Sequence, residues 1–159
     1  MEKDLARTFA ARITQASKTE LVVIMYEVLL SDIASAKEYF HKGEDEKAMH
    51  DIKHGQKFLN ELMSSLNYQY EISLNLMSLY IFVNKRIMDA YYKKEAEALD
   101  EAKEVLEILM KGFSEIAAGD KSGPVMTNTG QIYAGLTYGR GTLNETYVDP
   151  NQANRGFMA

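Results

Sequence analysis

The sequence has no cysteine, no tryptophan and only two prolines among 159 residues. Without cysteine, the chain cannot form a disulfide, bind a metal through a thiolate or use a cysteine nucleophile. Its longest uninterrupted apolar run, Leu21–Tyr26, is far shorter than the roughly 18 residues that cross a bilayer, and it is followed by Glu27. The first residues, with Glu2, Lys3 and Asp4, lack the basic region and apolar core of a secretory signal. We therefore expect no membrane insertion and a cytoplasmic location.

Basic residues are also too few for a nucleic-acid-binding surface. The chain has 18 basic and 23 acidic residues, which gives a net charge of -5 at neutral pH, whereas phosphate neutralisation requires a broad basic surface. We expect no nucleic acid partner. An apolar fraction of 46% is sufficient for the core of one domain of this length.

Helix-breaking residues are concentrated at the end of the chain. Both prolines and seven of the ten glycines lie from Gly119 onward, so the preceding residues can form long helices. This distribution divides the chain into an N-terminal arm over 1–16, a helical body over 17–118 and a glycine-rich, aromatic tail over 119–159.

Within the body, apolar residues recur at steps of three and four, the pattern of a helix with one buried face. Four segments show it. They are Val22, Met25, Leu29, Ile33, Ala36, Phe40; then Ala48, Ile52, Gly55, Leu59, Leu62, Leu66; then Ile72, Leu76, Leu79, Val83, Ile87, Ala90; and finally Leu99, Ala102, Leu106, Leu109, Phe113, Ile116.

The connections between these segments are short, which forces neighbouring helices to run antiparallel. We therefore predict an all-α fold, an antiparallel up-down four-helix bundle. Ser17 and Glu20 have the spacing of a capping box at the start of the first bundle helix. Gly43 is expected to end that helix and Gly119 to end the last.

Two segments lie outside the bundle. In the arm, Leu5, Phe9 and Ile13 recur every four residues, which predicts a short amphipathic helix that is separated from the body over residues 14–16. The tail has no helical period, yet it carries apolar and aromatic side chains between Ile132 and Tyr147. Such a tail is either flexible or docked on its own bundle or a partner.

We find no catalytic motif and expect no enzyme and no cofactor. A four-helix bundle that binds two metal ions supplies glutamates and Glu-x-x-His motifs from its helices, and that pattern is absent. His50 and His54 share a helical face, but no other helix offers a histidine to complete a metal site. His54 would be the phosphoryl acceptor if the bundle were a histidine phosphotransfer domain. Two solvent-facing histidines explain the pattern better.

The bundle has more apolar surface than one core stripe can use. The first helix is apolar on nearly every side from Leu21 to Leu30, and the third adds Leu74, Met77 and Ile81 to its stripe. This surplus fits either a thicker core with the arm packed over it or a groove for the amphipathic helices of another chain. The nine methionines favour a groove slightly, because flexible thioethers adapt to varied partners.

Several motifs resemble those of the flagellin export chaperone family, FliS. The run from Thr14 to Glu27 is similar to the family's Thr-Ala-Ser-Pro-Glu-Glu-Leu opening and the Leu-Met-Leu-Tyr-Asp helix that follows. Similarity continues through 52–67, 72–94 and 99–109, and covers about residues 9–117. The chain departs from the family at Lys18, where proline is usual, at Glu27, where aspartate is usual, and at Thr8–Phe9, where a tyrosine is expected.

The resemblance implies a non-enzymatic cytoplasmic chaperone that binds the disordered C-terminal segment of flagellin, prevents premature polymerisation and aids type III flagellar secretion. The alternatives are a bundle adaptor for a partner other than flagellin and a metal- or phosphate-handling bundle. Further partners would be the export gate, a co-chaperone or an anti-sigma factor, and the chain would be a monomer or a weak or domain-swapped dimer.

From the surplus apolar residues of the second and third helices we predict a partner-binding surface. We also expect the arm, through Leu5, Phe9 and Ile13, to dock in the same groove in the free protein. The predicted surface consists of Phe58, Met63, Leu74, Met77 and Ile81.

Overall fold

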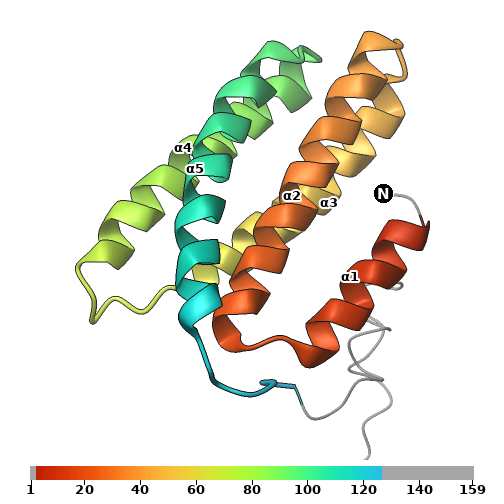
Figure 1. Cartoon of the computed structure of the whole chain (residues 1–159). Helices are drawn as coiled ribbons and strands as arrows, with labels where there is room; N and C mark the ends of the chain where they lie inside the picture. The colour runs from red at the N-terminus through yellow and green to blue at the C-terminus, as the bar shows by residue number, and fades with distance from the viewer. Residues whose placement is uncertain (1–2, 127–159) are drawn as a thin grey trace, which may run out of the picture.

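The computed structural model describes residues 3–126, and these fold into five helices with no strand (Figure 1). The helices are α1 (Lys3–Gln15), α2 (Lys18–His41), α3 (Asp45–Ser64), α4 (Ile72–Lys93) and α5 (Glu97–Gly119). The prediction of an all-helical bundle with an N-terminal arm is confirmed. The predicted docking of Ile132–Tyr147 falls outside the described residues.

The helix ends follow from local sequence. Glu20 N–H donates to Ser17 Oγ over 3.3 Å, and Ser17 N–H donates to Glu20 Oε2 over 2.7 Å, which completes the capping box of α2. Gly43 adopts a φ of 72° in the turn to α3, a conformation that favours glycine. The arm helix extends through Thr14 and Gln15, so the break before α2 is limited to Ala16 and Ser17 rather than spanning 14–16.

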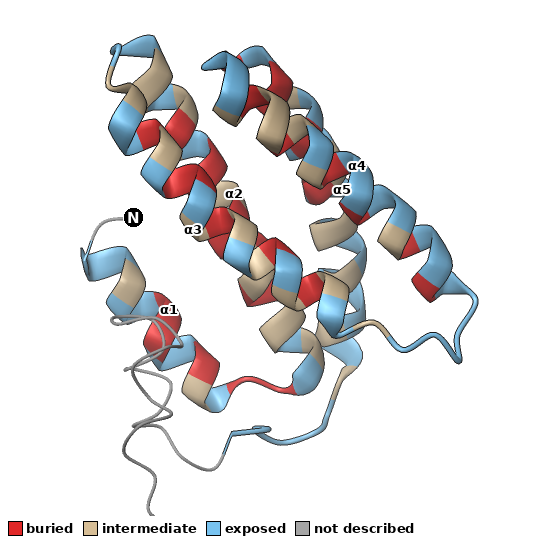
Figure 2. Cartoon of the chain, turned by 180° about the vertical axis from the view of Figure 1, so that it is seen from behind, coloured by how far each residue is buried: buried red, intermediate tan, exposed pale blue. Residues whose placement is uncertain are grey.

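The core lies between α2, α3, α4 and α5. Figure 2 shows buried residues along the faces on which these helices meet and exposed residues along their outer faces. α2 packs extensively on both α3 and α5, α5 packs on α4, and α3 packs less extensively on α4. The largest fully buried side chains include Tyr26 of α2 and Tyr80 of α4, whose hydroxyl groups hydrogen-bond to each other. Burial raises the pKa of both phenols, so this pair stays protonated.

The arm helix forms a second, smaller cluster on the outside of the bundle. The tight turn at Ala16 and Ser17 reverses the chain, so that α1 lies beside α2 (Figure 1). This cluster consists of Phe9, Ile13, Ala16, Ile24 and Val28, with Leu21 and Phe58 packed against it.

Candidate partner-binding surfaces

Three of the predicted binding residues form a row on the outer side of α4. Leu74, Met77 and Ile81 are separated by three and four residues, which aligns them along one line of the helix. The side chains of Leu74 and Ile81 are 61% and 55% exposed, and Met77 is half-buried. We call these three residues the α4 row. It is separate from the buried stripe of α4 and leaves apolar surface in contact with solvent.

The α4 row continues to the edge between α3 and α4. Gln56 Nε2 donates to Asn84 Oδ1 over 3.0 Å and lies 3.2 Å from Met88 Sδ, which fixes the register of the two antiparallel helices. Met63 lies seven residues after Gln56, and Met77 lies seven residues before Asn84. Two turns along each helix therefore bring these methionines to the same level on the same edge.

Phe58 lies on the other flank of α3. It packs against the arm cluster, and its ring meets the ring of His54 edge-on with centroids 5.2 Å apart. The five predicted residues therefore form two surfaces: Met63 and the α4 row at the α3–α4 edge, and Phe58 beneath the arm.

The arm is attached by few contacts. Phe9 and Ile13 are 5% and 8% exposed, whereas Leu5 is 37% exposed. The Arg12 guanidinium forms a two-point ion pair with Glu27 of α2, and this hydrogen bonding raises the pKa of Arg12. Two apolar side chains and one partly exposed ion pair thus carry most of the docking.

The position of the arm differs from the shared groove expected from sequence. Among the described residues, α1 packs on α2 and on Phe58 of α3, away from the α4 row. The physical reason is the turn at Ala16 and Ser17, which is so short that α1 must return alongside α2.

An exposed apolar group that was not predicted from the sequence lies in the turn between α3 and α4 and at the first residue of α4. Tyr68, Tyr70 and Ile72 are 55%, 64% and 63% exposed. They precede Leu74 directly and so extend the apolar surface of the α4 row beyond the start of the helix. Two tyrosines and an isoleucine within five residues were the available signal. Tyr68 and Tyr70 interrupt the helical pattern, and Ile72 was assigned to the buried stripe of the third bundle helix.

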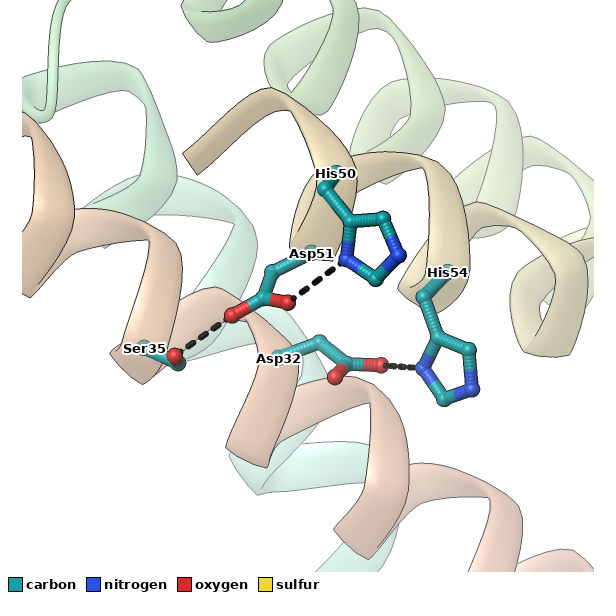
Figure 3. A network of polar contacts seen from close by, with 5 residues as sticks. All are labelled: Asp32, Ser35, His50, Asp51 and His54. Atoms are coloured by element: carbon teal, nitrogen blue, oxygen red, sulfur yellow. Dashed lines mark hydrogen bonds and ion pairs between the residues drawn. The ribbon is translucent and has the colours of Figure 1, made fainter. Parts of the chain in front are cut away.

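A polar network joins α2 to α3 (Figure 3). His54 Nδ1 lies 2.6 Å from Oδ2 of the buried Asp32, and His50 Nδ1 lies 3.2 Å from Oδ1 of Asp51. Ser35 Oγ donates to the other oxygen of Asp51 over 2.5 Å. Burial raises the pKa of Asp32. Both histidines were predicted from the sequence to face solvent. His50 is largely exposed, whereas His54 is held in the interface between α2 and α3, so the prediction is wrong for His54.

Within residues 3–126, no three or more histidine, aspartate or glutamate side chains are grouped so that they could hold a metal ion. No helix in that part of the chain is long and apolar enough to cross a membrane.

Residues 1–120, well over half of the chain, match the protein family described as flagellar protein FliS. The match includes α1 and all four bundle helices. No curated protein matches the chain.

Proposed function

Because the chain belongs to the FliS family of flagellar proteins, which are non-enzymatic cytoplasmic chaperones that bind flagellin, we propose that it holds the disordered C-terminal segment of flagellin before export. In this role it prevents premature polymerisation and aids type III flagellar secretion. Amphipathic segments of an unassembled subunit expose apolar faces that invite self-association, and covering those faces keeps the subunit apart from its copies.

The observation that carries this proposal is the docking of α1. An amphipathic helix already lies on the apolar surface formed by Ile24, Val28 and Phe58, and it is held by Phe9, Ile13 and one ion pair. A surface that accepts one amphipathic helix through so few contacts can accept another with the same spacing of apolar residues. In the proposed complex, a helix of the flagellin segment replaces α1.

The α3–α4 edge supplies the second contact surface. Met63, Met77 and Ile81 lie along this edge, and Leu74 continues the row toward the exposed aromatic residues of the preceding turn. An extended partner segment can follow the bundle from the arm surface to this row. The flexible methionine side chains adapt to its apolar residues.

Release for export requires moderate affinity despite a large contact area. A disordered segment loses conformational entropy when it folds on the chaperone, and this cost offsets part of the interface energy. Binding that is coupled to folding can therefore be both extensive and reversible.

The proposal is tested with a peptide spanning the C-terminal segment of the host's flagellin and calorimetric titration. Ile81→Asp places a charge in the α4 row, and burying it against the partner should weaken binding about tenfold or more. Met77→Asp should act in the same direction. Because Ile81 is more than half exposed, its replacement should leave the circular dichroism and melting temperature nearly unchanged.

Asn75→Asp is the matched control, since Asn75 is an exposed residue of α4 that lies two positions from Met77 and faces away from the row. It adds the same charge and should leave the affinity unchanged. Equal affinities for the Ile81→Asp and Asn75→Asp variants would remove the α4 row from the binding surface. A large loss of stability in Ile81→Asp would place that residue in the core.

A further inference from the structure

After α5, the chain turns back toward the junction of α1 and α2. We call residues 120–126 the return segment; it passes beneath the α1–α2 turn (Figure 1). Asp120 shapes its beginning, because the backbone N–H and the hydroxyl of Ser122 donate to Asp120 Oδ1 over 2.9 and 2.6 Å. The carboxylate thereby closes a tight turn directly after the helix.

The return segment is attached to the first turn of α2. Thr19 Oγ1 donates to Asp120 Oδ2 over 2.8 Å, across 101 residues of sequence. The hydrogen bonds from Ser122 and Thr19 hold the pKa of Asp120 well below its usual range, so the carboxylate is charged. A negative charge at this position also interacts favourably with the N-terminal end of α2.

The second attachment is at the linker itself. Val125 N–H donates to the carbonyl oxygen of Ala16 over 3.2 Å. Ala16 and Ser17 are the residues between α1 and α2, and both are buried. For α1 to swing away from α2, the backbone must rotate at this linker. The bond from Val125 opposes that rotation, while the bond from Thr19 holds the return segment in place.

We propose that the return segment is a clamp on the α1–α2 linker, which keeps α1 docked on α2 and determines how often α1 opens. One attachment is on the linker, at Ala16, and the other is on α2, at Thr19. Loss of either attachment releases the linker and increases the population of the open arm. The inference concerns the free chain and does not depend on which partner replaces α1.

Hydrogen exchange of the full-length chain, measured by mass spectrometry without any partner, tests the clamp. Thr19→Val removes the hydroxyl donor and keeps the shape of the side chain, and it leaves the capping box of Ser17 and Glu20 intact. Losing a hydrogen bond to a charged group should raise exchange in α1 on the order of tenfold. Asp120→Ala should have the same effect, while exchange in α3 to α5 stays unchanged.

Ser114→Ala is the control, because it removes a hydroxyl that donates to the carbonyl oxygen of Met110 in the same helix, over 2.7 Å, and takes no part in the two attachments. It should leave exchange in α1 unchanged. Three results would overturn the clamp: unchanged α1 exchange in both Thr19→Val and Asp120→Ala, an equal rise of exchange throughout the bundle, or an α1 that already exchanges without protection in the parent chain. Since flagellin is absent, none of these results bears on the proposed partner.

Discussion

Replacing Phe9 by alanine should strengthen the binding of flagellin. Phe9 is 5% exposed and is the largest side chain that α1 buries against α2. Removing its ring costs the docked arm about 1.5–3 kcal/mol of apolar burial. Each 1.4 kcal/mol is a factor of ten, so the ratio of docked to open arm should fall roughly 10- to 100-fold. The flagellin peptide binds only molecules whose arm is open, so its apparent affinity is the intrinsic affinity multiplied by the open fraction. The apparent affinity of the Phe9→Ala variant should therefore rise by at most the factor by which the ratio of docked to open arm falls.

The assay is titration of the flagellin C-terminal peptide into the Phe9→Ala variant, together with a thermal melt. Because Phe9 lies outside the main core, the melting temperature should change by only about a few degrees. Leu5→Ala is the control: Leu5 is 37% exposed, and its truncation should alter the affinity by no more than about twofold. Weaker binding by a Phe9→Ala variant with an unchanged melting temperature would refute the reasoning, since the arm would then contribute to the complex instead of competing with the partner.

Three further predictions concern the bundle. Tyr26→Phe leaves the buried hydroxyl of Tyr80 without its partner and should lower the free energy of unfolding in urea by about 1–3 kcal/mol. The double variant with Tyr80→Phe should lose less stability than the sum of the two single changes, and an additive loss would argue against the hydrogen-bonded pair. Burial raises the pKa of Asp32, so the native state binds its proton more readily than the unfolded chain does. The resulting stabilisation is complete below the unfolded pKa of about 4 and is lost as pH rises through the native pKa. The unfolding free energy of Asp32→Asn should therefore increase relative to that of the parent chain as pH rises from about 3 to 7. A difference between the two unfolding free energies that does not change with pH would contradict this prediction. Finally, a Cβ at Gly55 would lie 3.0 Å from a leucine methyl of α2 and 3.2 Å from Asp32 Cβ, so Gly55→Ala should destabilise the bundle by about 1–3 kcal/mol. A Cβ at Gly112 would have no atom within 4 Å, so Gly112→Ala should stabilise the bundle by up to about 1 kcal/mol. Equal effects of the two changes would exclude close packing at Gly55.

Much of the fold could be predicted because the signals are local. The steps of three and four in the apolar pattern locate the helices, the Ser17 and Glu20 side chains mark the start of α2, and Gly119 is the last residue of α5. Lys94 illustrates the limit: it adopts a left-handed φ of 56° at the end of α4, although lysine has no preference for that conformation. The short turn to α5 requires it, and that requirement comes from the packing of two helices.

The surfaces could be predicted only in part, because each depends on which helix faces lie together. The spacing of Leu74, Met77 and Ile81 was sufficient to identify an apolar row on α4. That Phe58 lies on the opposite flank of α3 depends on the angle at which α3 meets α2. The bond between Thr19 and Asp120 joins residues 101 positions apart, and no sequence pattern connects them.

The central claim is that this chain holds the C-terminal segment of flagellin, and co-purification with flagellin tests it most directly. The chain is expressed with the host's full-length flagellin and, separately, with flagellin that lacks its C-terminal segment. The account predicts that full-length flagellin remains bound through affinity purification and gel filtration, whereas the truncated subunit is lost. Equal retention of both forms, or of neither, would contradict the account.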